Sequence, residues 1–516
     1  MTIDTETLGS PGWWLQVLSR KLHERNEGRA WGTAVAFGGS ALREREVRPG
    51  LFLLRDWYRG NPPLPEPAEG WRKGFTEFLR LARMNYAELV VEPTRFRMRP
   101  RGWRTAVAGD DTGDAQALRI ARANDLAVAF GDVAKDMLSL ADAYMIVGEP
   151  QEATGIPLIT AESPLTTITA HDRATGKTLA ALKEQMDEWT GEFSSYVFTP
   201  GRVDVARRAT KAGFTGSVYG PDWDWDEAAS GALPAAFADV VPVFRFRNRD
   251  GVGDFEPHLD VLARINNGLL DRVVVSKLQA FRQRAIKNLP ETSDGQEPRP
   301  DGSNVVDYSG AFEADPGTLW QVPDGVDFWE SQAIDLGPLR MAVKDDVEGL
   351  AAVTSTPLHL ITPDAASGSA EGASLLREGH IYKVIDRRDR ASGPLARVMA
   401  CAFAFMGDQD RADVTQIETL WDPAERFSLA EKGSAAAQLN GILPDEELFT
   451  EVLQYPPDAI PRLLSMKRAQ AATALLFAPP APAASAAAAT PAAITATATP
   501  APVSTDQGAA PTPSGT

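Results

Sequence analysis

Cysteine is nearly absent from this sequence, and its scarcity excludes several kinds of protein. The 516 residues include one cysteine, Cys401, which lies in an apolar run. A single thiol cannot build a framework of disulfides, and it cannot supply a thiolate cluster for a metal. None of the five histidines has a second histidine or a cysteine at ligand spacing. We therefore expect no metal site and no cofactor.

Positive charge is also in short supply. Lys and Arg number 52 against 70 Asp and Glu, which gives a net charge of −18 and a pI of about 4.9. Tight binding to nucleic acid of any sequence depends on Lys and Arg that neutralise phosphates, so this balance argues against it. It does not exclude a protein that must let DNA slide past without sticking.

A targeting signal and long apolar segments are missing as well. The first ten residues, MTIDTETLGS, lack the basic start and the apolar core of a signal peptide. Outside the Ala- and Pro-rich tail, no run of about 18 uninterrupted apolar residues could span a bilayer. We expect a soluble, intracellular protein without a membrane partner.

Complete catalytic motifs are not found. Residues 171–178, HDRATGKT, match the end of a phosphate-binding loop, but His171 stands where the first glycine of that loop is required. This favours a solvated hairpin over an ATPase. Residues 221–228, PDWDWDEA, hold acidic side chains that a two-metal nuclease could use, but no lysine lies close by. A surface loop anchored by Trp223 and Trp225 is the favoured interpretation, so we expect no enzymatic activity.

The clearest pattern that is present is helical and covers residues 254–290. Asp254 can cap the N-terminus, Pro257 suits the first turn, and Pro290 ends the pattern. The apolar residues form two stripes at spacings of three and four, so two flanks need cover. A ring of identical subunits would cover both, and the alternative is a central core helix of one domain. The stripes are Phe255, Leu259, Leu262, Ile265, Leu269 and Val273, and Leu270, Val274, Leu278, Phe281 and Ala285.

A basic group lies near the C-terminus of this predicted helix. Lys277, Arg284 and Lys287 would share one side, with Arg282 beside them. The favoured interpretation is that these cations stabilise the end of the helix. The alternative is a weak contact with phosphates or with a neighbouring acidic helix.

The remaining segments predict a mixed α and β chain. Segment 94–105 is basic and alternating, which fits an exposed hairpin or an edge strand. From residue 471 the chain is rich in Ala, Pro and Thr and is expected to be disordered. Strands are expected within 144–249 and at 414–421, and helices at 12–26, 71–91, 115–145, 337–354, 374–406 with a break at 392–394, 427–440 and 445–453.

Five stretches, in this order, carry a resemblance to the portal proteins of tailed double-stranded-DNA bacteriophages, of the siphophage type. The resemblance extends over most of residues 45–470. The stretches are LRDWYRGNPPLP, ITAESPLTTITAHDRATGK, VPVFRFRNRD running into DFEPHLDVLARINNGLLDRVVVSKLQAFRQRAI, ITPDAASGSAEGASLLREGHIYKVIDRR, and VTQIETLWDPAERFSLAEKGSAAAQLNGILPDEEL.

The resemblance implies an α+β portal fold. The expected parts are a mixed α/β wing (1–250), a first stem helix (251–289), a clip (290–330), a second stem helix (331–362), a tunnel loop (363–374), a wing helix and strand (375–424), a helical crown (425–470) and a disordered tail (471–516). The turn formers and aromatic residues of 291–330 agree with a small subdomain at the tip of a helical hairpin.

The resemblance also implies a function. Such a chain forms a homo-oligomeric ring, usually a dodecamer, at one capsid vertex, and DNA passes through its axis during packaging and ejection. The implied partners are the major capsid and scaffolding proteins, the large terminase subunit and then a head-completion adaptor. The expected location is the virion, after assembly in the host cytoplasm. A packaging enzyme, a terminase-like ATPase or nuclease, is the alternative.

Three groups of site residues follow from the resemblance. The tunnel loop would meet double-stranded DNA without sequence-specific binding, because it is small, flexible and free of Lys and Arg. The second stem helix would present acidic residues to the channel, and the clip would dock partners through aromatic residues. The residues are Asp364, Ser367, Gly368, Ser369 and Glu371 of the loop, Asp345, Asp346 and Glu348 of the stem, and Tyr308, Phe312 and Trp320 of the clip.

Overall fold

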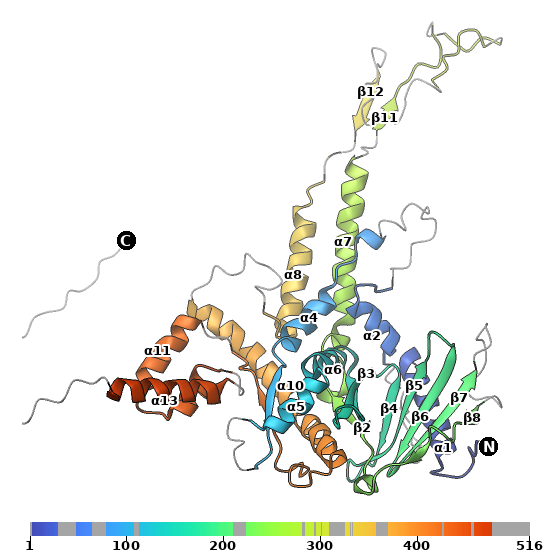
Figure 1. Cartoon of the computed structure of the whole chain (residues 1–516). Helices are drawn as coiled ribbons and strands as arrows, with labels where there is room; N and C mark the ends of the chain where they lie inside the picture. Colours follow the sequence, from blue (N-terminus) through green and yellow to red (C-terminus); the bar gives the residue numbers. More distant parts are fainter. Residues whose placement is uncertain are drawn as a thin grey trace, which may run out of the picture. The chain divides into compact units, whose positions relative to one another are not determined.

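The computed structural model combines helices and antiparallel sheets, which confirms the α+β class (Figure 1). The chain divides into two units, Met1–Leu463 and Leu464–Thr516. The structure describes residues 3–28, 48–63, 79–107, 113–209, 223–280, 284–293, 296–300, 302–308, 326–330, 332, 334–357, 370–425, 428–455 and 459–476.

The helices and strands are identified here by their labels in Figure 1. The helices are α1 (Pro11–Glu27), α2 (Leu51–Tyr58), α4 (Tyr86–Arg95), α5 (Ala115–Ala123), α6 (Leu126–Leu140), α7 (Leu259–Ala280), α8 (Gly337–Val353), α10 (Ala370–Phe405), α11 (Leu429–Leu439), α12 (Asp445–Glu447) and α13 (Ile460–Leu476), with short helices at Ala235–Phe237, Arg249–Gly251, Glu256–His258 and Leu448–Val452. The strands are β1 (Pro100–Arg104), β2 (Asp142–Pro150), β3 (Pro157–Glu162), β4 (Thr167–His171), β5 (Thr178–Met186), β6 (Glu192–Thr199), β7 (Arg202–Ala209), β8 (Asp224–Trp225), β9 (Gly231–Ala232), β10 (Val243–Arg247), β11 (Arg284–Lys287), β12 (Asp327–Glu330) and β13 (Glu418–Trp421).

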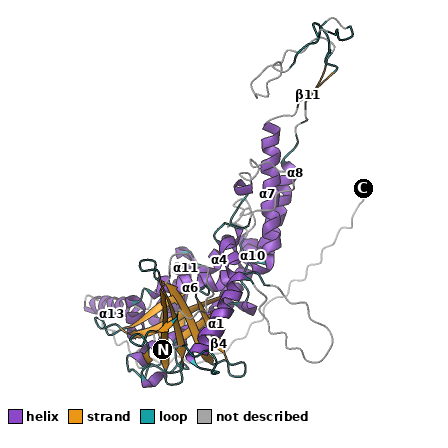
Figure 2. Ribbon diagram, turned by 90° about the vertical axis from the view of Figure 1, so that its right-hand side faces the viewer, coloured by secondary structure: helices purple, strands orange, loops and turns teal. Residues whose placement is uncertain are grey.

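Two antiparallel sheets form in the β-rich region, where strands were expected. One has the order β4-β5-β6-β7-β8 with β9 beside β7, and the other has the order β10-β2-β3. Figure 2 shows the strands of this region in orange, beside the helices. Helix α1 packs Leu18 and Leu22 against Leu182 and Val197 of the first sheet. It begins where the Ser10 hydroxyl accepts a hydrogen bond from the Trp13 amide at 3.1 Å, which satisfies an otherwise unpaired donor.

The main core lies between α6, α10 and the sheet of β2 and β10. Phe130 of α6, Phe246 of β10 and Phe403 of α10 are each at most 1% exposed. The rings of Phe130 and Phe246 meet edge to face at 6.0 Å between centroids. This packing holds α10 against the sheet, and α10 in turn helps to position the elements that contact it.

The phosphate-loop-like segment is a hairpin turn, as the sequence favours. Strand β4 ends at His171 and β5 begins at Thr178, and the Asp172 amide donates to the Lys177 carbonyl at 2.9 Å. Nearby in sequence, Trp223 is buried and meets Phe193 edge to face at 5.6 Å, which supports its predicted anchoring role.

Residues 254–290 do not form one helix, and that prediction was wrong. Helix α7 ends at Ala280, and β11 pairs antiparallel with β12 so that Ile286 lies opposite Phe328. Hydrogen bonds and side-chain pairs from a segment about 40 residues away outweigh the local helical periodicity there. Arg284 and Lys287 therefore do not share a helix face with Lys277, and Arg282 lies outside the described residues.

Helix α10 also differs from the prediction. It begins at Ala370 rather than at Ser374, and it continues through Pro394 where a break was expected. The Ser392 hydroxyl lies 2.8 Å from the Arg388 carbonyl and accepts from the Trp421 indole at 2.9 Å. These bonds and the buried neighbours of Pro394 hold the turn, although proline removes one amide donor.

Segment 94–105 forms no hairpin of its own. Helix α4 extends to Arg95. Strand β1 pairs with the distant β13 in a two-stranded sheet, so it is an edge strand, and its Trp103 is 2% exposed. The predicted helix 115–145 is two helices, α5 and α6, and Ala141 with φ of 73° turns the chain into β2.

Residues 471–476 are helical, so the predicted start of the disordered tail is too early. Helix α13 extends to Leu476 because Ala and Leu are strong helix formers. Residues 477–516 lie outside the described ranges.

Candidate functional site

Helices α7 and α8 lie side by side as a pair that ends in the β11–β12 ribbon (Figures 1 and 2). The first predicted stripe of α7 is buried, with Phe255, Leu262, Ile265 and Leu269 at most 4% exposed. Gly268 allows the helices to approach, because a Cβ there would lie 2.8 Å from Cγ2 of Val343. The chain's own core therefore covers a stripe that the sequence could equally have assigned to a neighbouring subunit.

The three predicted stem acids lie on α8 but do not act together. Asp346 points to α7, where its two carboxylate oxygens accept from Arg264 at 2.7 and 2.9 Å. Asp345 is exposed, and Glu348 lies 3.6 Å from Lys344 one turn away. The charge of Asp346 is thus neutralised by Arg264 within the helix pair, whereas Asp345 and Glu348 remain at the surface.

The ribbon end of the pair includes one of the three predicted clip residues. Tyr308 donates its hydroxyl to the Pro290 carbonyl at 2.9 Å. Trp329 of β12 is 51% exposed, although the sequence did not select it as a site residue. Phe312 and Trp320 lie outside the described residues.

The base of α7 is tied to α10 by a buried ionic cluster. The carboxylate of Asp254, 1% exposed, lies 2.9 Å from Lys383 Nζ and 3.0 Å from Arg387 Nη2, and it accepts from Asn248 Nδ2 at 2.9 Å. Burial alone would raise the pKa of Asp254, but Lys383 and Arg387 outweigh it and the pKa is lowered. Asp254 is not the N-cap that the sequence indicated, because α7 begins later and its ionic partners lie on a distant helix.

The end of α8 is fastened to α10 as well. His380 places Nδ1 3.1 Å from the Ser355 carbonyl and Nε2 3.4 Å from the Pro93 carbonyl. Lys383 also donates to the Thr354 carbonyl at 3.1 Å. Burial lowers the pKa of His380 to about 4, and the nearby charges act in the same direction. Nothing in the sequence around His380 identified it, because its partners are backbone carbonyls far along the chain.

The predicted tunnel loop, 363–374, comes after α8 in the sequence and includes the first residues of α10. Asp364, Ser367, Gly368 and Ser369 lie outside the described residues. Glu371 belongs to the first turn of α10, and its side chain is not described. The loop as predicted, 363–374, therefore overlaps the start of a helix.

Two of the residue types considered for metal-binding or thiol chemistry can be placed in the described part of the chain. No group of three or more His, Cys, Asp or Glu in these residues could hold a metal ion. Cys401 is buried, which raises the pKa of its thiol and leaves it unreactive. Among the described helices, none is long and apolar enough to cross a membrane.

Comparisons with known proteins point to one family. The family model for phage portal proteins of the SPP1 Gp6-like type matches residues 43–471. A comparison with curated proteins found no match. Two solved structures share 14% identity with the chain. One is a chain from the neck of a native GTA particle, computed with C12 symmetry. The match covers 85% of the present chain and 98% of the GTA chain, at a TM-score of 0.43. The neck of an empty GTA particle, computed with C6 symmetry, covers 76% and 96% at 0.41.

The two structural similarities are too weak to carry an argument, so the family match decides. It spans most of the sequence, including the helix pair, the ribbon and α10. The match supports the portal function and does not support the alternative of a packaging enzyme. This chain belongs to the SPP1 Gp6-like family of phage portal proteins.

Proposed function

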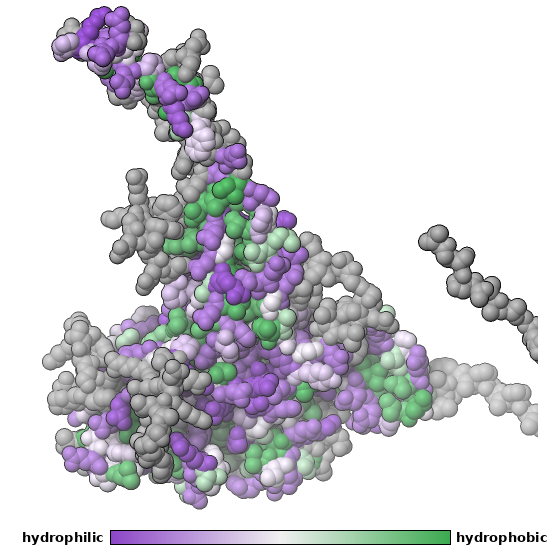
Figure 3. Space-filling model, turned by 180° about the vertical axis from the view of Figure 1, so that it is seen from behind, coloured by the Kyte–Doolittle hydropathy of each residue, from purple (hydrophilic) through white to green (hydrophobic). Residues whose placement is uncertain are grey.

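We propose that the chain is one subunit of a homododecameric ring at a capsid vertex, with α7 and α8 as the stem around an axial DNA channel. The observation that carries the proposal is apolar surface on the helix pair that the chain itself does not cover. Ile334, Met341 and Val353, at or beside α8, are each at least 50% exposed. Figure 3 shows apolar surface along this part of the molecule. A neighbouring copy would bury such side chains at about 25 cal/mol per Å².

The channel surface follows from the same arrangement. The tunnel loop predicted at 363–374, which overlaps the start of α10, would project toward the axis, and His380 and Lys383 hold the end of α8 that precedes it. Asp345 and Glu348 would add negative charge to the channel wall. Within segment 363–374 there is no Lys or Arg to hold a phosphate, and like charges there and on DNA would allow the polymer to slide.

The ribbon and the adjoining segment 290–330 would form the clip. Tyr308, Phe312 and Trp320 remain the proposed contacts for the large terminase subunit and later for the head-completion adaptor. The exposed Trp329 supports a docking role at this end, since tryptophan is enriched among residues that dominate binding energy. The proposed location is the portal vertex of the virion, with the major capsid and scaffolding proteins as partners during assembly in the host cytoplasm.

The experiment compares the wild type with Met341→Asp and Val353→Asp by electron microscopy and mass photometry. The wild type should form rings, and each variant should keep its helical content but form fewer rings, because a carboxylate in an apolar interface is costly. Trp189→Asp is the matched control, since Trp189 is 97% exposed on a hairpin tip in the other half of the unit. A wild type that stays monomeric even with its scaffolding protein would contradict the ring. Steady ATP hydrolysis by pure protein would revive the enzyme alternative.

A further inference from the structure

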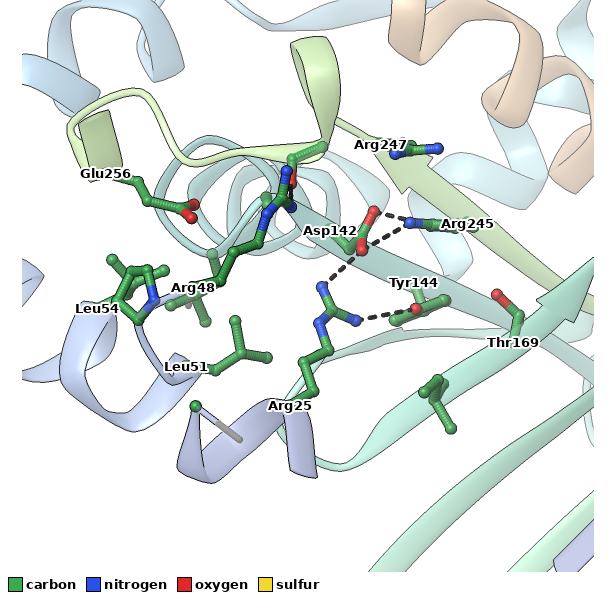
Figure 4. A pocket seen from close by; sticks show the side chains of 16 residues that line it. Arg25, Arg48, Leu51, Leu54, Asp142, Tyr144, Thr169, Arg245, Arg247 and Glu256 are labelled. Atoms are coloured by element: carbon green, nitrogen blue, oxygen red, sulfur yellow. Dashed lines mark hydrogen bonds and ion pairs between the residues drawn. The ribbon is translucent and has the colours of Figure 1, made fainter. Parts of the chain in front are cut away.

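A pocket with a strong excess of arginine lies where α1 ends, α2 begins and β10 leads toward α7 (Figure 4). Its volume is about 130 Å³. Four guanidinium groups line it, Arg25 from α1, Arg48 before α2, and Arg245 and Arg247 from β10, against two carboxylates, Asp142 and Glu256. Four positive charges against two negative charges leave an excess of two. The portal function uses none of these residues.

Two of the arginines are already neutralised in part. Asp142 is 5% exposed and lies 2.5 Å from Arg25 Nη2, while Arg245 contacts both of its oxygens at 2.7 and 2.8 Å. Burial alone would raise the pKa of Asp142, but the two arginines outweigh it and the pKa is lowered. Asp142 thus pairs directly with Arg25 and Arg245, and Arg247 acts on it through its charge without forming an ion pair.

Arg48 and Arg247 supply the excess charge. Arg48 donates Nη1 to the Gly251 carbonyl at 2.9 Å, and the Arg247 guanidinium lies against the same glycine. A Cβ on Gly251 would come within 2.6 Å of Arg247 Nη2, and the φ of 66° at this position favours glycine. Within the described ranges, no carboxylate lies at salt-bridge distance from either arginine. Glu256 accepts from the Gly253 amide at 2.8 Å, and its burial raises its pKa although the charges of Arg48 and Arg25 act in the opposite direction.

The N-terminus of α2 adds an independent positive contribution. Its N-cap is Gly50, which gives no side-chain hydrogen bond to the first turn. A Cβ at Gly50 would lie 2.5 Å from the Asn26 carbonyl, so the close approach of two segments excludes the residues that usually cap. Leu51 and Leu54 of the first turn line the pocket. Uncapped amides at a helix N-terminus favour an anion.

We propose that this pocket binds a small tetrahedral oxyanion, of the inorganic phosphate or sulfate class, between Arg48, Arg247 and the N-terminus of α2. Arginine forks match the oxygens of such anions, and the cavity is several times the volume that one water molecule needs. The bound anion would join α1, α2 and β10 to the Gly251 turn that precedes α7. It would therefore stiffen the junction between the sheets and the helix pair.

The test measures thermal unfolding of the full-length protein as sodium phosphate is titrated at constant ionic strength, with sodium chloride as the balance. Phosphate stabilises proteins in general by exclusion from their surface, so the signal is the difference between variants. The variants are Arg247→Gln and Arg48→Gln. The matched control is Arg173→Gln, an exposed arginine in the β4–β5 turn outside the pocket. Isothermal calorimetry with phosphate, and with sulfate as competitor, measures binding directly.

We expect saturable binding by the wild type and the control, with affinity about tenfold or more weaker in each pocket variant, because each loses a charge-assisted hydrogen bond. If one variant fails to fold, the other variant and calorimetry on the wild type still test whether the pocket binds phosphate. Equal phosphate responses in all four proteins, or no heat of binding in the wild type, would overturn the proposal. Binding of a short DNA duplex that Arg247→Gln abolishes, without a response to free phosphate, would overturn it as well.

Discussion

At the scale of single residues, Asp254 is the charge on which the base of the helix pair depends. It is almost fully buried and serves Lys383 and Arg387 together. Removing one partner of a buried ionic cluster leaves the others unpaired in a region of low dielectric constant. Removing it should therefore cost more stability than removing one partner of a surface ion pair.

We predict that Asp254→Asn destabilises the protein by about 3–5 kcal/mol in urea unfolding. Asp386→Asn is the control, because Asp386 is 39% exposed although it also pairs with Arg387. It should cost at most about 1 kcal/mol. The folded pKa of Asp254 lies below its unfolded value, so its contribution is present above about pH 4 and is lost as pH falls further. Equal losses in the two variants would contradict the burial argument.

We predict a second pH dependence of stability, which comes from His380. Its folded pKa of about 4 lies below the unfolded value of about 6.5, so the unfolded chain binds the proton more readily. Its contribution is complete above about pH 6.5 and is lost, by about 3 kcal/mol, as pH falls to 4. Urea unfolding at a series of pH values should show a shallower slope between pH 6.5 and 4 in His380→Gln. An unchanged slope would mean that groups other than His380 cause the pH dependence.

At the scale of elements, the distance between α7 and α8 is set by a glycine. Gly268 faces Val343, whose β-branched side chain has little freedom to move aside. Gly349 on α8 has open space around the position of a Cβ. The two glycines therefore make a matched pair, both within helices of the same hairpin.

We predict that Gly268→Leu destabilises the protein by about 1–3 kcal/mol, because the added side chain overpacks the contact with α8. Gly349→Leu should change stability by about 0.5 kcal/mol or less. Circular dichroism during urea unfolding measures both. If Gly349→Leu is the more damaging of the two, the helix pair is packed differently from the structure described above.

At the scale of the whole molecule, the C-terminal tail is set apart by composition. Beyond Leu476 it contains Ala, Pro and Thr with a single charged residue, Asp506. This composition is the reason that the sequence predicts a disordered tail, and residues 477–516 lie outside the described ranges.

We predict that a chain lacking residues 478–516 assembles and packages DNA as the full chain does. Ring counts in electron micrographs and packaged DNA per particle are the measurements. Truncation at residue 459, which also removes α13, is the comparison, and it should lower stability because Ile460 is fully buried. Loss of rings in the shorter deletion would mean that the tail has a structural partner.

Several features of this protein follow from local sequence. Ser10 and Pro11 start α1, and β2, β3, β4, β6 and β10 lie where strands were predicted, whereas the strand predicted at 216–220 lies outside the described residues. The portal family was identified from ordered stretches that the family match then covered. In each case neighbouring residues in the chain carry the information, because caps, turns and periodicity act over a few residues.

Other features were decided only by tertiary structure. The strand at Arg284–Lys287 depends on pairing with β12, and Asp254 depends on two cations carried by α10. The arginine pocket gathers side chains from α1, β10 and the start of α2, which no local motif connects. The physical reason is the same in each case. Burial and ion pairing are interactions between segments that are distant in sequence, so whether a polar or charged residue stabilises the protein depends on the neighbours that the fold places around it.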